Sequence, residues 1–302
     1  MYINNQYIEK IGHWKSVLFV PANEDRFLSS CVSKGANAIA LDLEDSVLES
    51  EKNIARQNYK RNLNALREQG SDVCVRINRD LRACVADLEA VVVEGTDAIV
   101  VPKVISGDHL VLIDELISEL EFERGLPLNS IALIAMVESA RALQNASTWG
   151  QDCSRLAGLF FGTEDFCFDT GMQATADNLF YPAQQLVLAA KSMQLLSFGF
   201  PASIADYSDE SVLRDAVEKG RSLGFDGVFC IHPKQVNVVN QSYQSTTLEI
   251  DKAAAIVSAF EHARELGKGA VEVGGKMVDA PVYNLARKVL LKFAEENPKF
   301  NY

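Results

Sequence analysis

Three carboxylates lie within four positions near the start of the chain, where residues 42–47 read DLEDSV after an apolar run. In an extended strand Asp42 and Glu44 would share one face, because successive side chains alternate between the two faces. Buried carboxylates that lie close together are costly unless a cation or a proton intervenes. The segment therefore predicts a site in which Glu44 and Asp45 relay protons or hold a metal-bound water. The alternative is that Asp45 and Ser46 cap a following helix.

Other polar residues also follow apolar runs that have the length of a strand. Their carboxylates predict a hard divalent cation, and Mg²⁺ or Mn²⁺ usually takes one or two carboxylates together with water and substrate oxygens. Lys103 could instead form a Schiff base with a keto acid. We favour ion pairing with the nearby acids, which keeps its amine protonated. His232 could act as an acid or base, or form a structural hydrogen bond. The other candidates are Arg76, Asn78, Glu138, Glu164, Asp165 and Asp206.

The apolar runs alternate with stretches of helical period, which is the pattern of repeated βα units. Eight such strands would close a parallel (β/α)8 TIM barrel of the α/β class, with reactive groups at the C-terminal ends of the strands. An open doubly wound sheet would be expected to carry a glycine-rich turn after its first strand, where this chain has PANE. We therefore favour the barrel. The predicted strands are Ser16–Val20, Ala38–Leu43, Val73–Ile77, Ala98–Val101, Ile131–Val137, Leu156–Phe161, Phe198–Ile204 and Gly227–Ile231.

The C-terminal part of the chain is more than a barrel requires. Residues 1–240 are predicted to form the barrel domain and residues 241–302 a helical extension. Within the extension we expect a helix over Leu248–Leu266, a glycine-rich turn over Gly267–Gly275 and a second helix over Val282–Glu296. Such a turn can serve as the hinge of a lid. The alternative is a helix packed against the outside of the barrel.

Composition excludes several classes of function. The net charge of −12 on 302 residues repels nucleic acid, and no Lys/Arg cluster offsets it. The six cysteines have no CxxC spacing, which argues against a zinc site or a disulfide framework. No apolar stretch reaches the roughly 20 residues of a membrane span, and the N-terminus lacks the features of a secretory signal. We expect a cytoplasmic protein. A P-loop, a GxSxG elbow and metal-binding His pairs are absent.

Eight short motifs occur together in a fixed order from about Ser16 to Ala280. They are LFVPANEDRF, AIALDLEDSV, VRIN, VPKV, VES, FGTEDF, LGFDGVFCIHPKQ and GGKMVDAP. The ordered set resembles the citrate lyase beta subunit-like proteins of the HpcH/HpaI aldolase superfamily, which include malyl-CoA and citramalyl-CoA lyases. The chain departs from the family pattern at Ala22, where many relatives have glycine, and at Phe166, where leucine is common.

The resemblance implies a TIM barrel with Mg²⁺ bound by Glu138 and Asp165, and substrate contacts from Arg76 and Glu138. It also implies that Asp279, in the GKMVD segment, belongs to a lid that reaches the active site of a neighbouring subunit. A homotrimer, or a hexamer built from trimers, is therefore expected.

The implied reaction is the Mg²⁺-dependent cleavage of malyl-CoA, methylmalyl-CoA or citramalyl-CoA to an acyl-CoA and glyoxylate or pyruvate. Asp279 would protonate the enolate carbon, Arg76 would stabilise developing negative charge, and Glu44 and Asp45 would assist in proton relay. Arg26 is a candidate contact for CoA phosphates, and a surface salt bridge is the equal alternative. Two other functions stay open: a citrate lyase beta subunit that acts on an acyl-carrier-protein thioester, and a non-catalytic CoA-binding protein.

Overall fold

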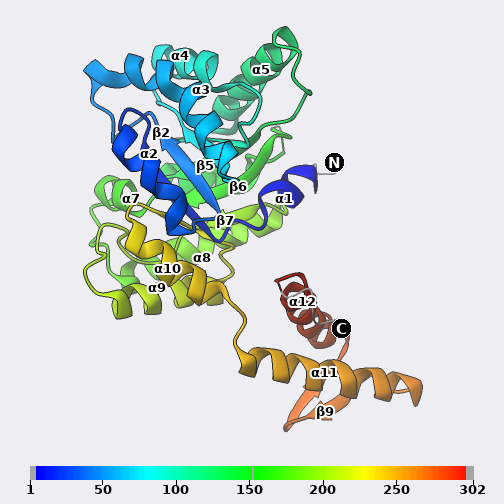
Figure 1. Ribbon diagram of the computed structural model, residues 1–302. Helices are drawn as coiled ribbons and strands as arrows, with labels where there is room; N and C mark the ends of the chain where they lie inside the picture. The colour runs from blue at the N-terminus through cyan, green and yellow to red at the C-terminus, as the bar shows by residue number, and fades with distance from the viewer. Residues whose placement is uncertain (1–4, 152, 297–302) are drawn as a thin grey trace. The chain divides into compact units, whose positions relative to one another are not determined.

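The computed structural model describes residues 5–151 and 153–296. The chain divides into two compact units, Met1–Tyr243 and Gln244–Tyr302, which are described separately below. Residues 297–302 of the predicted extension lie outside the described residues. Figure 1 shows the helices and strands of both units.

The first unit is built on eight parallel strands in the order β7-β6-β5-β4-β3-β2-β1-β8. The sheet closes where Phe198 pairs with Gly227, and the Gly199 N–H donates to the Gly227 carbonyl at 2.9 Å. The predicted TIM barrel is confirmed, and the open sheet is wrong. The strands are β1 (Ser16–Pro21), β2 (Ala38–Asp42), β3 (Asp72–Arg76), β4 (Ala98–Val101), β5 (Ala132–Val137), β6 (Leu156–Phe161), β7 (Leu196–Phe198) and β8 (Val228–Cys230).

Helices surround the strands of this unit (Figure 1). They bury the outer faces of the strands, which explains why the strands are apolar on both sides. These helices are α1 (Asn5–Ile11), α2 (Asp25–Cys31), α3 (Lys52–Glu68), α4 (Leu81–Val91), α5 (Gly107–Glu123), α6 (Ala140–Asn145), α7 (Thr163–Thr170), α8 (Ala176–Ser192), α9 (Glu210–Leu223) and α10 (Pro233–Tyr243), with 3₁₀ turns η1 (Val32–Lys34), η2 (Glu49–Glu51) and η3 (Ala146–Thr148).

Alternation along the strands decides which side chains enter the barrel. In β2, Ile39 and Leu41 pack in the cluster that includes the surrounding helices, whereas Ala38 and Ala40 belong to the cluster inside the barrel. Asp42 is the next inward position of the same strand. The same step of two residues leads from Cys74 to Arg76 and from Met136 to Glu138. The strands thus carry polar side chains to the C-terminal mouth of the barrel.

Strand β7 differs from its prediction, because it covers Leu196–Phe198 instead of Phe198–Ile204. The apolar run continues past the strand, so hydrophobicity alone does not mark its end. Gly199 has φ 134°, a conformation that favours glycine, and Pro201 has no N–H to donate to a sheet. These two residues turn the chain out of the sheet.

The second unit contains α11 (Thr247–Glu265), the antiparallel strands β9 (Val271–Val273) and β10 (Lys276–Val278), and α12 (Ala280–Glu296). A capping box between Thr246 and Glu249 starts α11. The two helices share an apolar cluster, and the rings of Phe260 and Tyr283 stack at 4.8 Å. The predicted glycine-rich turn is part of the hairpin that β9 and β10 form, and Gly274 and Gly275 between these strands both have positive φ.

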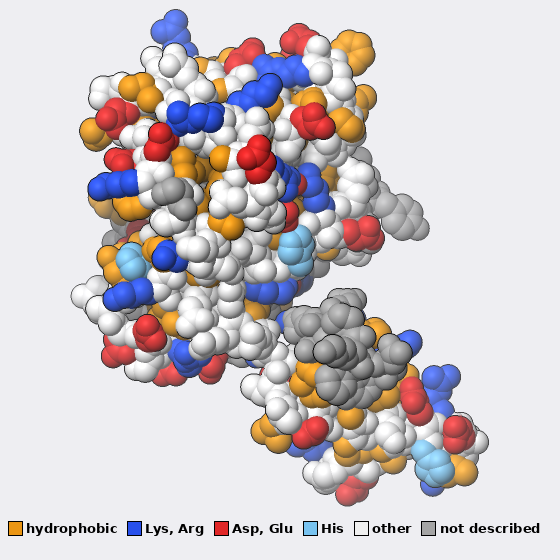
Figure 2. Space-filling model, in the orientation of Figure 1, with side chains coloured by type: hydrophobic (Ala, Val, Ile, Leu, Met, Phe, Trp, Pro, Cys, Tyr) orange, Lys and Arg blue, Asp and Glu red, His pale blue; other side chains and the backbone are white. Residues whose placement is uncertain are grey.

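Charges of both signs are intermingled on the face of the first unit drawn in Figure 2. The six cysteines are all buried and free. Within the described residues, every helix is too short or too polar to span a lipid bilayer.

Candidate active site

A cavity of about 320 Å³ opens at the C-terminal ends of the barrel strands. One part of its wall is polar and includes Asp42, Asp45, Arg76, Glu138 and Asp165. The other part is apolar and is made largely of aromatic rings. A concave site of this kind, with a few convergent polar groups, is where a small molecule would be expected to bind.

Asp42 and Arg76 end neighbouring strands, and the parallel register pairs them directly. Arg76 donates from Nε and Nη2 to the two oxygens of Asp42, both at 2.7 Å. Burial alone would raise the pKa of Asp42, but the charge and hydrogen bonds of Arg76, with a further bond from Ser46, outweigh it and lower that pKa. The Arg76 guanidinium also lies 4.8 Å from the centroid of the Phe19 ring, and its Nη1 lies 3.1 Å from Glu44. Arg76 is therefore held in one orientation at the cavity wall.

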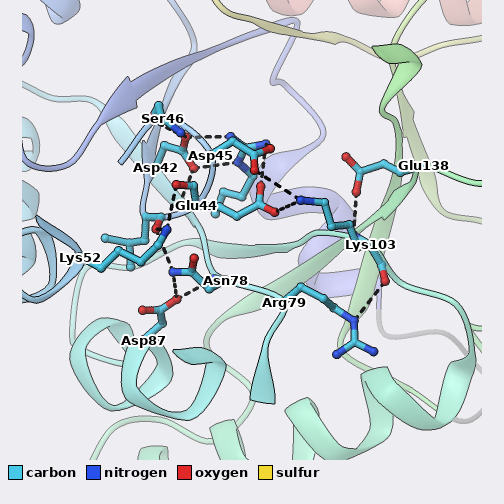
Figure 3. Close-up of polar contacts among 12 residues, drawn as sticks. Asp42, Glu44, Asp45, Ser46, Lys52, Asn78, Arg79, Asp87, Lys103 and Glu138 are labelled. Atoms are coloured by element: carbon cyan, nitrogen blue, oxygen red, sulfur yellow. Dashed lines mark hydrogen bonds and ion pairs between the residues drawn. The ribbon is translucent and has the colours of Figure 1, made fainter. Parts of the chain in front are cut away.

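Lys103 follows β4 and pairs with the carboxylates that follow β2 (Figure 3). Its Nζ donates to Glu44 Oε1 at 2.6 Å and to Asp45 Oδ1 at 3.3 Å. Burial alone would lower the pKa of Lys103, but hydrogen bonds and charges from these two acids raise it. A protonated amine is a poor nucleophile, so the geometry favours ion pairing over a Schiff base. Burial, with the Asp45 charge, raises the pKa of Glu44 against the opposing effects of Arg76 and Lys103.

Glu138 directly follows β5, and only 4% of its surface is exposed. Its Oε2 accepts a hydrogen bond from the Lys103 main-chain N–H at 2.6 Å. Burial, together with the charges of Asp165 and Glu44, raises the pKa of Glu138 to about 8. Asp165 lies in the first turn of α7 and lines the same cavity. The structure thus brings Glu138 and Asp165 into one site, close enough for the charge of Asp165 to contribute to the raised pKa of Glu138.

The carboxylates of Glu138 and Asp165 are the ligands that this site could provide to a cation. Across the described part of the chain, no group of three or more His, Cys, Asp and Glu side chains could hold a metal ion. Mg²⁺ does not need such a group, because it usually keeps several waters and takes one or two protein carboxylates. Burial and, after it, the charge of Asp165 disfavour the ionised form of Glu138, and a divalent cation between the two side chains would favour that form. The residues present therefore fit Mg²⁺ better than zinc, which prefers nitrogen and sulfur ligands.

Gly162 is the single residue between β6 and α7, and it lies against Glu138. A Cβ added at this position would come within 2.5 Å of Glu138 Cγ and 2.7 Å of its Oε1. Any side chain would displace the carboxylate, so glycine is required for close approach.

Gly162→Ala is expected to move Glu138 and to weaken cation binding by at least roughly tenfold, with about 1–3 kcal/mol lost from the free energy of unfolding. Isothermal titration with Mg²⁺ and urea denaturation measure the two effects. Gly269→Ala is a matched control, because a Cβ there would meet no atom within 4 Å. Unchanged Mg²⁺ affinity in Gly162→Ala would contradict this role.

Two predicted site residues are not among the residues that line this cavity of the first unit. Asp279 is in the second unit between β10 and α12, where its Oδ1 accepts from Val282 N–H at 3.4 Å at the start of α12. Arg26 is in α2, is 72% exposed, and its Nε lies 3.0 Å from Glu24. The salt bridge that the sequence left as an alternative for Arg26 is therefore present.

The remaining candidates have structural contacts. Ser46 bonds to Asp42 and Asp45 pairs with Lys103, so the expectation that they cap the next helix is wrong; that helix begins at Lys52, after the 3₁₀ turn η2. Asn78 donates to the Leu43 carbonyl and to Asp87. Asp206 accepts from Ser208, and His232 accepts from the Lys234 N–H while it stacks on Tyr207.

Five phenylalanine rings line the cavity, and three of them, which come from different strands, lie close together. Phe160 and Phe229 stack with centroids 4.4 Å apart, and Phe19 lies 5.3 Å from Phe229. Neither these rings nor Gly162 stand out in the sequence, because their proximity depends on which strands are neighbours. The FGTEDF motif does contain Gly162, and its position beside a carboxylate-bearing turn is the one available signal.

Comparison with known proteins agrees with this geometry. The model of the family HpcH/HpaI aldolase/citrate lyase matches residues 15–233. The citrate lyase subunit beta of Leuconostoc mesenteroides subsp. cremoris is 31% identical over 94% of both chains. A (3S)-malyl-CoA thioesterase of Cereibacter sphaeroides is 33% identical over 92% of this chain and 94% of its own. The protein CitE of Mycobacterium tuberculosis, solved with magnesium, acetoacetate and coenzyme A, is 26% identical with a TM-score of 0.72 over 93% of this chain and 98% of its own.

The family model covers most of the chain, and the curated relatives align with nearly all of it. The ordered motifs and the eight-stranded barrel are therefore explained by common descent, and the expected carbon–carbon lyase type of enzyme is confirmed at the level of the family. This chain belongs to the HpcH/HpaI aldolase/citrate lyase family.

Proposed function

We propose that this chain is a Mg²⁺-dependent lyase that cleaves malyl-CoA, methylmalyl-CoA or citramalyl-CoA to an acyl-CoA and glyoxylate or pyruvate. The observation that carries the proposal is that Glu138 and Asp165 line one cavity together with the oriented guanidinium of Arg76. The relatives support it, because one is named for malyl-CoA and another was solved with magnesium and coenzyme A.

The side chains have distinct tasks in this reaction. Glu138 and Asp165 would hold the cation, which when bound would polarise the oxygens of the oxo-acid end. Arg76 offers N–H groups to the negative charge that develops when the carbon–carbon bond breaks and its electron pair moves to the thioester enolate. The raised pKa of Glu44 suits it, with Asp45, to take the hydroxyl proton by relay. Asp279 would give a proton to the enolate carbon and so complete the acyl-CoA.

The charge of the cavity favours a 2-oxo acid with a single carboxylate. Among the described residues that line it, Arg76 is the one cationic side chain, and it already pairs with Asp42 and Glu44. Oxaloacetate, the product of citrate cleavage, has a second carboxylate, and the described lining offers it no second cationic side chain. An unpaired buried carboxylate costs several kcal/mol. We therefore place the citrate lyase alternative second. The similarity to citrate lyase beta subunits is the observation in its favour.

A panel of condensation reactions tests the proposal. Acetyl-CoA and propionyl-CoA are incubated with glyoxylate, pyruvate or oxaloacetate in the presence of Mg²⁺, and the thioesters formed are identified by mass spectrometry. We expect a product with glyoxylate or pyruvate and its loss with EDTA. A product with oxaloacetate alone would support the citrate lyase alternative. CoA binding without any product, and without deuterium exchange at the acetyl methyl group, would support a non-catalytic CoA-binding protein.

Asp279→Ala is expected to lower kcat by roughly 10²- to 10⁴-fold, because a positioned acid contributes about that much to proton transfer. Mg²⁺ binding should be unchanged, since the proposed ligands are in the other unit. We also propose a homotrimer or hexamer in which a neighbour supplies this acid. Mixing Asp279→Ala with Arg76→Met subunits should then restore part of the activity. Full kcat in Asp279→Ala would contradict the role of the acid, and no recovery after subunit exchange would contradict its supply by a neighbour.

Magnesium affinity should rise with pH below pH 8. The pKa of Glu138 is raised to about 8, so its carboxyl holds a proton at pH 6 that the cation must displace. Each pH unit below the pKa then weakens binding by up to about tenfold, and affinity should level off above it. Isothermal titration at pH 6, 7, 8 and 9 measures this. A Kd that does not change between pH 6 and 8 would show that Glu138 is not a ligand.

A further inference from the structure

Lys103 has an unusual backbone for a lysine. Its φ is 51°, in the left-handed region that glycine adopts freely and other residues adopt at a cost. It lies in the short connection between β4 and α5, next to the end of β5 that carries Glu138. Strained backbone conformations of this kind cluster at functional sites, where the surrounding structure maintains them.

Both ends of Lys103 contact the candidate site (Figure 3). The main-chain N–H donates to Glu138 Oε2 at 2.6 Å, and the side-chain Nζ donates to Glu44 Oε1 at 2.6 Å. The main-chain carbonyl accepts from Arg79 Nε at 3.2 Å. One residue therefore connects the acid after β2 with the acid after β5, through its side chain and its backbone respectively.

The two contacts depend on each other. With φ in the ordinary negative region, the peptide plane before Lys103 would rotate and its N–H would leave Glu138. The ion pair of Nζ with Glu44 and Asp45 anchors the far end of the residue and so opposes that rotation. A glycine at position 103 would adopt this φ without strain and so would not need the ion pair. An uncharged side chain at the same position would still be strained in this conformation and would lack the ion pair.

We propose that Lys103 is a positioning residue, whose ion pair with Glu44 and Asp45 holds its own backbone in the conformation that orients Glu138 to receive the cation. The inference rests on the proposed function, because it takes Glu138 as a Mg²⁺ ligand. It goes beyond that function by assigning the orientation of Glu138 to a backbone donor under side-chain control. Replacing a lysine that merely formed a surface ion pair would not weaken cation binding, because the loss of a nearby positive charge favours a cation.

Substitutions of Lys103 can distinguish the effect of its backbone conformation from the effect of its charge. Lys103→Met removes the anchor and keeps the strain, and we expect Mg²⁺ binding to weaken roughly tenfold, or about 1.4 kcal/mol. Lys103→Gly removes anchor and strain together, and we expect affinity within about threefold of the wild type. Lys103→Arg keeps the charge and should also retain affinity. The readouts are the Kd from isothermal titration with Mg²⁺ and the Mg²⁺-dependent shift in Tm, each at pH 8.5.

Gln194→Gly is the matched control, because Gln194 also has a positive φ of 57° and is exposed at the end of α8. It should raise Tm without changing the Kd for Mg²⁺. Equal affinities in the Met and Gly variants, or wild-type affinity in Lys103→Met, would overturn the inference and leave the proposed function intact. Failure of the wild-type chain to bind Mg²⁺ would overturn both.

Discussion

Glu138→Gln is expected to abolish Mg²⁺ binding and to lower kcat/KM by roughly 10³-fold or more, which corresponds to about 4 kcal/mol of transition-state stabilisation. The substitution keeps the shape of the side chain and its capacity to accept from the Lys103 N–H. It removes one of the two carboxylates that could face the cation. Titration calorimetry and the condensation assay measure the two losses.

The same variant should stabilise the metal-free protein, although it impairs Mg²⁺ binding and activity. The folded-state pKa of Glu138 is raised to about 8, so the stability associated with its protonated form is complete below the unfolded pKa and is lost as pH rises through 8. Metal-free Glu138→Gln should therefore be several kcal/mol more stable than the wild type at pH 9, and similar to it at pH 4. Asp169→Asn, in the same helix as Asp165, is a control that should leave Mg²⁺ binding unchanged. Retention of Mg²⁺ binding by Glu138→Gln would contradict the assignment.

Arg76→Met is expected to lower the free energy of unfolding by about 3–5 kcal/mol and to eliminate activity. Its side chain is 12% exposed and pairs with Asp42, which is 1% exposed, so the substitution leaves a buried carboxylate without its partner. Urea denaturation monitored by circular dichroism measures the change in stability.

Two further variants make the result for Arg76 specific. Asp42→Asn combined with Arg76→Met should recover a large part of the lost stability, because the orphaned charge is removed. Arg26→Met should change stability by less than about 0.5 kcal/mol, since the Arg26 side chain is largely exposed. A loss of stability in Arg76→Met no larger than in Arg26→Met would contradict the importance of the buried pair.

The barrel could be predicted from the sequence because each strand is an apolar run bounded by polar residues. The rule failed at β7, where the run continues through Phe200 beyond the end of the strand. What ends β7 is the positive φ of Gly199, and hydrophobicity carries no information about it. The hairpin in the second unit was also missed, since glycines at 267–275 are compatible with a turn of any kind.

The polar residues of the site could be predicted in part, because alternation places Asp42, Arg76 and Glu138 at inward positions at the ends of their strands. The hydrogen bonds that orient them could not be predicted. The pairing of Asp42 with Arg76 requires the register between β2 and β3. The backbone contact from Lys103 to Glu138 requires a positive φ at a residue type that gives no sign of one.

The central claim is that Glu138 and Asp165 together hold a divalent cation at the mouth of the barrel. Crystals soaked in Mn²⁺, which accepts the same carboxylate ligands, test it directly by anomalous scattering. The account predicts one strong peak about 2.0–2.3 Å from a carboxylate oxygen of each residue. A peak at other residues, or none at this pair of carboxylates, would contradict it.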